Sequence, residues 1–375
     1  MNNSIKMQTC KLGELLTVKH GWAFKGEFFE EAGEHCILTP GNFYEKGGFK
    51  PNSGKERYYS GNYPEEYLCK KGDLIVAMTQ QAEGLLGSTA IVPEDNKYLH
   101  NQRIGLITCD ETRLNPLFAY YLFMTKTVRE QLERSSSGTK VKHTSPERIY
   151  DVVVEIPNVC NQVKIASLLY RIEKKIDSNV LINDNLQQMA YTEYMHMFYG
   201  KKPNGNLGDI IVENPKSSIQ VGDAKNVSGE IPFFTSGETI LKWHKALVNG
   251  RNCYLNTGGN ADVKFYVGRS AYSTDTWCIT AENNLTDYLY LLLDSIRSEL
   301  DLKYFQGTGL KHLQKPLLKD RTIYIPSQNE LSGFNADVQP LLSMISDNIR
   351  ESEELKSLRD WLLPMLINGQ STITD

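Results

Sequence analysis

The sequence predicts an α+β protein made of two copies of one unit, each a globular domain followed by a long helix. Three observations support this prediction. The two halves repeat one block of residues, a helical pattern of apolar residues closes each half, and short apolar runs typical of strands precede each pattern. A chain of 375 residues also has room for two or three domains of ordinary size.

The repeated block is a Gly-Thr loop sequence. It reads Gly-Thr-Lys-Val-Lys-His at 138–143 and Gly-Thr-Gly-Leu-Lys-His at 307–312, and an Ile-Pro pair stands thirteen residues after each histidine. A second match follows directly in the helical pattern, and Leu12–Leu15 resembles Leu207–Ile210. Matched blocks in the same order are improbable by chance, so we interpret them as tandem units of about 170 residues.

The repeat divides the chain into four parts. These parts are a globular domain at 1–157, a long helix at 158–200, a second globular domain at 201–326 and a second long helix at 327–370. Within the globular domains, β-branched and aromatic runs predict short strands. The predicted strands are residues 73–78, 89–92, 104–107 and 152–156 in the first domain and 253–255, 263–267, 276–279 and 322–325 in the second, with one helix in each domain at 116–132 and 288–300.

The first long helix is predicted because no proline or glycine interrupts residues 162–198, a stretch that would be about 55 Å long as a helix. Gly200 and Pro203 should end this helix. The second long helix carries Pro340, which should lie in its first turn or kink it. Pro364 and Gly369 should end the second helix.

Apolar residues in both helical stretches fall three or four positions apart, so each helix has one apolar stripe. Two such helices in one chain are expected to pair, and to run antiparallel if the chain turns back on itself. Two asparagines occupy the first stripe, where a polar residue fixes register at a cost in stability. The residues expected on these stripes are Ile165, Leu169, Ile172, Ile176, Asn179, Asn183 and Leu186 in the first helix and Leu341, Ile345, Ile349, Leu358 and Leu362 in the second.

The composition argues against several classes of protein. No apolar run approaches the roughly 20 residues that cross a bilayer, and residues 1–11 lack the apolar core of a signal peptide. The seven cysteines are scattered without a Cys-x-x-Cys pair, which argues against a zinc site and a disulfide scaffold. We therefore expect a cytoplasmic protein with reduced thiols, no membrane contact and no bound metal.

The sequence contains no Gly-x-Ser-x-Gly, P-loop or His-Glu-x-x-His motif. Asn115–Phe118 and Phe305–Gly309 resemble two loops of DNA amino-methyltransferases. The first fragment lacks the second proline of that motif, and the second belongs to the internal repeat and follows a helix where a cofactor loop needs a strand. We therefore interpret neither fragment as part of an active site, and we expect no catalytic residues.

The repeated loops suit a polyanion, because Gly-Thr backbone can offer amides and the lysines offer charge. Base readout needs side chains with paired donors and acceptors, which Gln, Asn, Arg and Lys provide. The net charge of −4 argues weakly against this function, although a basic face can coexist with acidic helices. The candidate DNA-binding residues are Gln80, Gln81, Asn101, Arg103, Thr139, Lys140, Lys142 and His143 in the first half and Trp243, Lys245, Asn260, Lys264, Arg269, Thr308, Lys311 and His312 in the second.

Several stretches carry a resemblance to a known family. They are Leu12–Leu15, Gly72–Thr79, Asn101–Gly105, Tyr272–Thr276 and, most telling, Asn161–Leu169 with its continuation to Leu186. On these residues the chain resembles the specificity subunits of type I restriction-modification systems over nearly its whole length. It departs from the family pattern at 327–331 and at Pro340, which leaves the start of the second helix open.

The resemblance implies a function and a set of partners. Family members have two target-recognition domains, each reading one half of a split double-stranded DNA target, and antiparallel helices that set the gap between the halves. The helices dock two methyltransferase subunits, which bind S-adenosylmethionine and methylate N6 of adenine, and restriction and translocase subunits can join. The chain itself would bind no cofactor and catalyse nothing. A coiled-coil scaffold that binds no DNA stays the alternative, and salt dependence of DNA affinity would separate the two.

Overall fold

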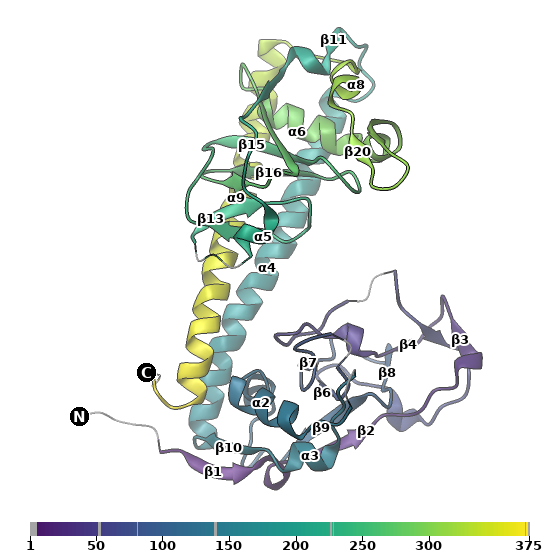
Figure 1. Ribbon diagram of the computed structural model, residues 1–375, viewed down its shortest axis with the longest axis vertical. Coiled ribbons are helices and arrows are strands. Elements are labelled where there is room, and N and C mark those ends of the chain that lie inside the picture. The colour runs from purple at the N-terminus through teal and green to yellow at the C-terminus, as the bar shows by residue number, and fades with distance from the viewer. Residues whose placement is uncertain are drawn as a thin grey trace. The chain divides into compact units, whose positions relative to one another are not determined.

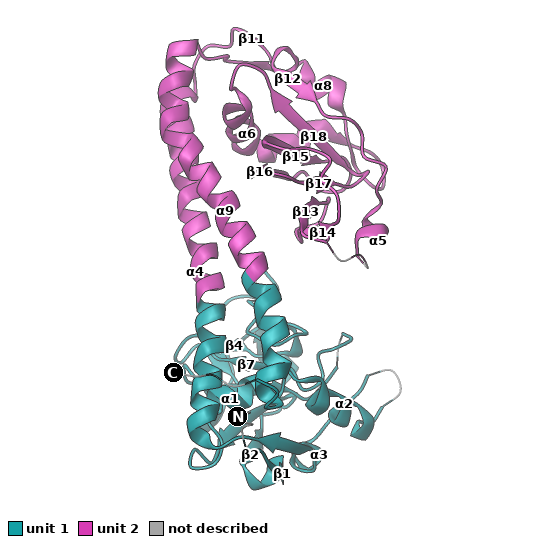
Figure 2. Cartoon of the chain, turned by 90° about the vertical axis from the view of Figure 1, so that its left-hand side faces the viewer, with its two compact units in different colours: residues 1–174, 355–375 teal, residues 175–354 magenta. Residues whose placement is uncertain are grey.

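A computed structural model describes residues 6–51, 54–80, 82–138, 141–225, 227, 229–371 and 373. The chain divides into two compact units (Figure 2), unit 1 with residues 1–174 and 355–375 and unit 2 with residues 175–354. Each unit contains a globular part and one segment of each of two 40-residue helices, α4 (Val159–Phe198) and α9 (Gln328–Ile367). Both helices therefore contribute to both units.

The two helices run antiparallel within each unit. In unit 2, Asn179 Nδ2 donates to Ser352 Oγ at 3.2 Å, and four residues later Asn183 Oδ1 accepts from Asn348 Nδ2 at 2.8 Å. In unit 1, Arg359 on α9 contacts Glu173 on α4 at 3.5 Å. The antiparallel pairing predicted from the apolar stripes is confirmed.

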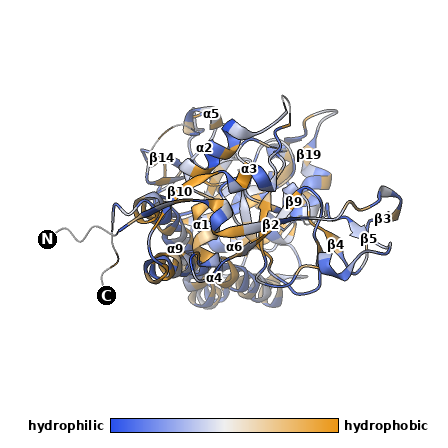
Figure 3. Ribbon diagram, turned by 90° about the horizontal axis from the view of Figure 1, so that it is seen from below, coloured by the Kyte–Doolittle hydropathy of each residue, from blue (hydrophilic) through white to orange (hydrophobic). Residues whose placement is uncertain are grey.

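Unit 1 is built on a four-stranded antiparallel sheet in the order β2-β9-β6-β7 (Figure 1). Apolar side chains from this sheet pack against three short helices and the segments of α4 and α9 that belong to the unit; β2 and α1 show orange, apolar segments in Figure 3. A small second sheet has the order β3-β5-β4-β8, and β1 pairs with β10. The bounds are β1 Gln8–Lys11, β2 Leu16–His20, β3 Phe29–Glu30, β4 Cys36–Ile37, β5 Tyr58–Tyr59, β6 Leu74–Ala77, β7 Thr89–Ile91, β8 Tyr98–Leu99, β9 Ile104–Cys109, α1 Pro116–Leu122, α2 Lys126–Ser135, α3 Pro146–Tyr150 and β10 Val153–Ile156.

Unit 2 repeats this plan with the sheet β12-β18-β15-β16, a second sheet β14-β13-β17 and the pair β11 with β21. Helix α6 and the paired segments of α4 and α9 supply much of its core. The bounds are β11 Gly205–Asn206, β12 Ile211–Glu213, α5 Val221–Ala224, β13 Ile231–Phe234, β14 Leu241–Trp243, β15 Arg251–Asn256, β16 Val263–Val267, β17 Ala271–Tyr272, β18 Thr276–Ala281, α6 Thr286–Ser295, α7 Arg297–Glu299, a π-helical turn Leu300–Tyr304, β19 Phe305–Gln306, β20 His312–Leu313, α8 Lys315–Lys319 and β21 Thr322–Ile323.

The internal repeat predicted from the sequence is confirmed in three-dimensional detail. The main sheets have the same strand order, and each second sheet contains one parallel pair, β4 with β8 and β13 with β17. A 3₁₀ turn opens each sheet, at Leu12–Glu14 and Leu207–Asp209, and its last, acidic residue accepts a hydrogen bond from the backbone N–H just before the turn. The same short-range chemistry therefore starts both units.

The predicted helices differ from the structure at four places, one of which is Pro364, predicted to end α9 but placed inside a helix that runs on to Ile367. The helix expected at 116–132 is two helices, because the hydroxyl of Thr125 donates to the Leu122 carbonyl at 2.7 Å and the chain turns there. The helix expected at 288–300 starts earlier and becomes irregular after Ser295. The placement of Pro340 in the first turn of α9 was wrong, because α9 begins twelve residues earlier, at Gln328.

A capping box explains where α9 begins. Ser327 Oγ accepts from the backbone N–H of Glu330, and the Glu330 carboxylate accepts from the Ser327 backbone N–H at 2.8 Å. Glu330 also pairs with Lys201 at 2.5 Å. Pro340 and Pro364 both lie inside the helix with exposed side chains. Gly369, with a φ of 67°, follows the helix end as predicted.

Candidate nucleic-acid interface

Three segments of unit 1 meet at one end of its main sheet. They are residues 78–80 after β6, residues 101–103 before β9 and the two described segments of a hairpin, residues 137–138 and 141–143, and we call them the loop triad. The hairpin closes where Ser137 and His143 exchange backbone hydrogen bonds of 3.0 and 2.8 Å. The Gln80 N–H donates to the Lys142 carbonyl at 2.9 Å, and the Met78 N–H donates to the Arg103 carbonyl at 3.0 Å. The triad is thus one hydrogen-bonded structure.

Unit 2 carries the same triad at the same end of its sheet, in residues 257–259, 273–275 and 306–312. The Gly259 N–H donates to the Lys311 carbonyl at 3.0 Å, and the Thr257 N–H donates to the Asp275 carbonyl at 3.0 Å. Strands β19 and β20 form its hairpin, with Gln306 opposite His312. The repeated Gly-Thr block of unit 2 therefore lies between the two strands of a hairpin.

Both hairpins need glycine at the first position of the repeated block. Gly138 and Gly307 have φ values of 99° and 150°. A Cβ at Gly138 would lie 2.1 Å from the Val141 carbonyl oxygen, and one at Gly307 would lie 2.7 Å from the Leu310 oxygen. A close backbone approach in a left-handed conformation explains why this residue recurs.

Three described basic residues of the hairpins and their surroundings, Lys142, Arg148 and Lys311, are already engaged within the chain. Lys142 forms an ion pair with Glu133, and Lys311 pairs with Asp301 at 3.0 Å. Arg148 donates to the Ser137 hydroxyl at 2.8 Å and to the His143 carbonyl at 3.1 Å. These side chains brace the hairpins, and part of their charge is compensated locally.

A buried histidine, His100, directly precedes the turn of residues 101–103 and forms a hydrogen bond with the residue that follows the turn. His100 is 1% exposed, and its Nε2 donates to the Ile104 carbonyl at 2.8 Å. Burial lowers the pKa of His100 to about 4, so the ring is neutral at pH 7. Asn101 Oδ1 accepts from the Arg103 backbone N–H at 3.1 Å and fixes the turn.

A cavity of about 450 Å³ adjoins the turn in unit 1. Phe24 and Phe29 are among its walls, and the Arg57 guanidinium lies 5.9 Å from the Phe29 ring centre. Among the described residues its polar lining comprises Thr39, Lys55, Arg57, Asn101, Gln102 and Arg103, with no carboxylate in that set. Aromatic surface and cationic or amide donors together are typical of nucleic-acid contacts.

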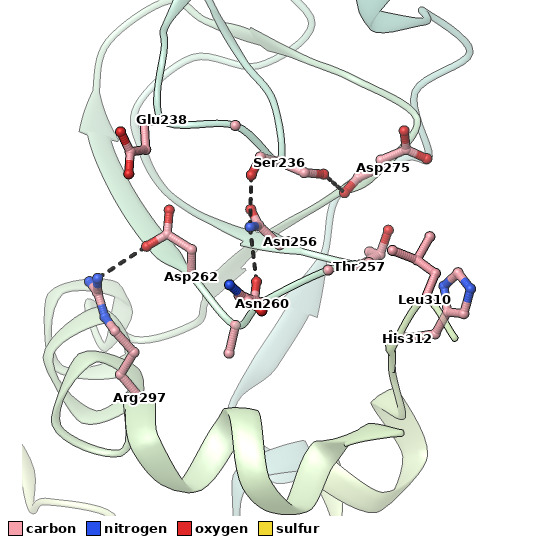
Figure 4. A pocket seen from close by; sticks show the side chains of 14 residues that line it. Ser236, Glu238, Asn256, Thr257, Asn260, Asp262, Asp275, Arg297, Leu310 and His312 are labelled. Atoms are coloured by element: carbon pink, nitrogen blue, oxygen red, sulfur yellow. Dashed lines mark hydrogen bonds and ion pairs between the residues drawn. The ribbon is translucent and has the colours of Figure 1, made fainter. Parts of the chain in front are cut away.

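A cavity of about 790 Å³ adjoins the corresponding turn of unit 2 (Figure 4). Asn256 lies at its centre, and its Nδ2 donates to the Ser236 carbonyl at 2.9 Å and the Asn260 carbonyl at 3.2 Å. Asp262 pairs with Arg297 at 3.1 Å. The remaining charged lining residues are Glu238 and Asp275, with His312 on the hairpin side.

The structure brings some of the sequence-predicted residues together and separates others. The triads or their cavities contain Gln80, Asn101, Arg103, Lys142 and His143 in unit 1 and Asn260, Thr308, Lys311 and His312 in unit 2. Gln81, Thr139 and Lys140 lie outside the described residues. Arg57, Glu238 and Asp275 were not among the predicted DNA-binding residues. Asp275 stood only within the family-like stretch Tyr272–Thr276, and Arg57 stands directly before β5.

Three predicted residues of unit 2 lie away from its cavity, and a fourth, Lys264, is engaged within the chain. Trp243 packs against Phe233, 5.8 Å between ring centres, at the end of β14 away from the cavity, and exposed Lys245 follows it. Arg269 follows the end of β16 opposite the cavity. Lys264 lies near the cavity, but its ammonium donates to the Thr235 carbonyl at 2.8 Å and pairs with Asp262 at 3.0 Å.

The stripe residues occupy different environments. Ile165, Leu169 and Ile172 are buried in unit 1 and Leu186 in unit 2, whereas Ile176, Leu341, Ile345, Ile349 and Leu362 are half-buried and Leu358 is 43% exposed. Asn179 is fully buried and donates to Glu351 Oε2 at 2.7 Å. Apolar side chains also lie on the outer surface of α4, where Val180, Leu181 and Met189 are more than half exposed.

One charged cluster anchors the sheet of unit 2 to α9. Arg251 on β15 donates three hydrogen bonds of 2.6–2.9 Å to Asp287 on α6. The same guanidinium donates to Ser343 Oγ at 3.0 Å and to the Gln339 carbonyl at 3.1 Å. Burial raises the pKa of Asp287, while the hydrogen bonds from Arg251 oppose that rise.

The two methyltransferase-like fragments have structural roles. Asn115 caps α1, its Oδ1 accepting from the Phe118 N–H at 3.0 Å. Phe305 and Gln306 form β19 of the hairpin rather than a loop between a strand and a helix. Among the described residues, none of the helices has the length and apolar character needed to cross a bilayer.

The structure thus contains two similar units, each with a loop triad beside a polar cavity. The chain belongs to the family described as type I restriction modification DNA specificity domain, whose model matches residues 4–188 and 201–339. The chain is thus a member of the type I specificity subunit family.

Known relatives agree with this assignment. The type I restriction enzyme MjaIX specificity subunit of Methanocaldococcus jannaschii is 24% identical over 301 residues, which cover 69% of each chain. The EcoBI specificity subunit of Escherichia coli is 27% identical over 167 residues, 44% of this chain and 32% of that one. The crystal structure of a type I system S subunit from M. genitalium aligns with a TM-score of 0.65 at 15% identity, covering 100% and 98% of the two chains, so the fold is shared.

Proposed function

We propose that this chain is the DNA-specificity subunit of a type I restriction-modification complex and that each unit binds one half of a split target. The observation that carries the proposal is the loop triad, which the chain builds twice with the same backbone hydrogen bonds. A single triad is compatible with an ordinary surface. Two equivalent triads in a chain of this family fit a target with two parts.

Each triad would divide its contacts between backbone and bases. The hairpin tips and their lysines would contact phosphates, which positions a duplex without reading its sequence. The side chains of Gln80 and Arg103 in unit 1 and Asn260 in unit 2 would reach base edges in the major groove. The residues that brace the triads would hold these side chains in place.

The helices would dock two methyltransferase subunits. The exposed apolar side chains of Val180, Leu181 and Met189 on α4 are candidate contact points, because apolar residues clustered on a surface favour protein interfaces. These partners would carry S-adenosylmethionine and extrude the target adenine from the duplex. The chain itself would supply recognition, and restriction and translocase subunits would complete the assembly.

The experiment is to map adenine methylation across the genome of a host that expresses the methyltransferase partners, with and without this chain. We expect methylation at one split, asymmetric motif that disappears without the chain. An unchanged methylation pattern, with all subunits present by immunoblot, would argue against the proposal.

A salt titration separates DNA recognition from a DNA-free scaffold. For the purified complex, the logarithm of duplex affinity should fall with the logarithm of salt by roughly 0.9 per phosphate contact. The absence of DNA affinity at low salt, with the partners bound, would favour the scaffold.

A further inference from the structure

Arg103 and Asp275 occupy the same place in the two units. The carbonyl of each residue accepts a hydrogen bond from the end of the neighbouring strand, from the N–H of residue 78 in unit 1 and from that of residue 257 in unit 2. The two turns share two further backbone hydrogen bonds. The N–H of residue 104 donates to the carbonyl of residue 101 at 2.9 Å, and the N–H of residue 276 donates to that of residue 273 at 3.1 Å. The preceding N–H groups, of residues 102 and 274, donate to the carbonyls of residues 22 and 219 at 3.1 and 2.9 Å. The repeat therefore places opposite charges at one equivalent position.

Both side chains are available to a ligand. Arg103 and Asp275 are exposed, and each uses only backbone atoms in hydrogen bonds with other described residues. Their backbones are held while their charged groups make no ion pair with the described part of the chain. This combination is unlike Lys142 and Lys311, whose charges are engaged.

The surroundings reinforce the sign of each charge. The described lining of the cavity beside Arg103 includes the guanidinium of Arg57 and no carboxylate. The cavity beside Asp275 contains exposed Glu238, while Arg297 in its lining is paired with Asp262. The two units thus offer different hydrogen-bonding partners to whatever they bind, donors in unit 1 and acceptors in unit 2.

We propose that Arg103 and Asp275 are specificity-determining residues, and that Arg103 reads a guanine in one half-site while Asp275 reads a cytosine in the other. A guanidinium matches the O6 and N7 acceptors of guanine, and a carboxylate accepts from the N4 amino group of cytosine. Adenine also has an amino group, but its N7 acceptor lies beside it and repels a carboxylate. The assignment rests on the proposed function and adds the base that each unit selects.

The test is to determine which DNA motif the assembled complex methylates in cells. Arg103→Gln should change one guanine position in one half-site towards adenine, because a glutamine amide pairs with adenine N6 and N7. Asp275→Asn should change one cytosine position towards adenine in the other half-site. We expect the wild-type preference at each position to fall by roughly tenfold or more.

Conservative and distant variants complete the design. Arg103→Lys and Asp275→Glu should keep the wild-type motif, because they keep the donor or acceptor. Two control substitutions lie away from these turns, because Arg113 follows the opposite end of β9 and Asp320 comes just after α8. Arg113→Gln and Asp320→Asn should therefore leave the motif unchanged. If a variant methylates nothing, its purified complex is tested for binding to a randomised duplex library, where the same base change is expected.

The outcomes distinguish this inference from the proposed function. A wild-type complex that writes no split motif would contradict the proposed function itself. A wild-type motif that persists in both Arg103→Gln and Asp275→Asn would overturn only the base assignment. Uniform weakening at every sequence, with no change of motif, would also overturn it, because that result marks a phosphate contact.

Discussion

Replacing Arg251 by methionine should destabilise unit 2 strongly. The Asp287 side chain is 1% exposed and would lose all three of its hydrogen bonds from the guanidinium. Removing one partner of a buried ion pair costs about 3–5 kcal/mol. Gln339 Nε2 stays 3.4 Å from the carboxylate, and Arg251 is 23% exposed, so we expect a loss of about 3 kcal/mol.

The stability lost in Arg251→Met should depend on pH, and the burial of Asp287 determines whether the loss grows or shrinks as the pH falls. Burial raises the pKa of this carboxyl, and the guanidinium opposes the rise. Without Arg251 the folded-state pKa rises further above its unfolded value, so the folded variant takes up a proton more readily than the unfolded chain. The deficit should therefore be largest at neutral pH and shrink as the pH falls, by at most about 1.4 kcal/mol per pH unit.

Hydrogen exchange measured by mass spectrometry can localise the effect. Peptides from β15 and β18 report on unit 2, and peptides from β6 and β9 serve as an internal control in unit 1. A second variant, Arg251→Met with Asp287→Leu, should recover most of the lost stability because no buried charge is left unpaired. A deficit below about 1 kcal/mol, or one that is the same at pH 7 and about pH 4, would refute the reasoning.

Three further perturbations test other parts of the structure. Gly307→Ala should destabilise its hairpin by about 1–3 kcal/mol, seen as faster local exchange, whereas Gly309→Ala in the same hairpin meets no atom within 4 Å and should be nearly silent. Lys140→Ala with Lys142→Ala should weaken duplex binding at all sequences alike and flatten the salt slope by about 1.8, so an unchanged slope removes this hairpin from the interface. Hydrogen bonding from its lysine partner holds the pKa of Glu330 at about 2, below the unfolded 4.5. The wild-type protein should therefore be more stable than the Glu330→Gln variant above about pH 4.5, and this difference in stability should disappear between about pH 4.5 and pH 2. A difference in thermal melting that does not depend on pH would contradict this account.

The sequence predicted the architecture because its strongest signals are local and repeated. A helix without internal glycine or proline, such as residues 162–198, needs no tertiary information to be recognised. The Gly-Thr block identified both units because close backbone approaches at Gly138 and Gly307 require the same residue in each.

The rest depended on contacts between distant segments. The capping box at Ser327 and Glu330 was visible in the sequence and would have placed the start of α9 correctly. The break at Thr125 and the cavity beside Asp275 were not visible, because they arise where loops from different strands meet. Trp243 was interpreted as a DNA contact, yet it fills a small apolar core with Phe233. The sequence pattern of an aromatic residue beside a lysine therefore does not distinguish a DNA contact from a core residue unless the fold is known.

The composition of unit 1 has a consequence for the order in which the protein matures. Leu366 and Ile367 are buried in the same core as Ile165 and Leu169, so residues near the end of the chain complete the unit that begins it. A ribosome makes these residues after all of unit 2, so unit 1, which is synthesised first, must wait for them. Unit 2 lies wholly within residues 175–354 and can close while unit 1 is still open. A chain that stops between residues 355 and 365 would therefore lack part of the core of unit 1 while unit 2 stays whole.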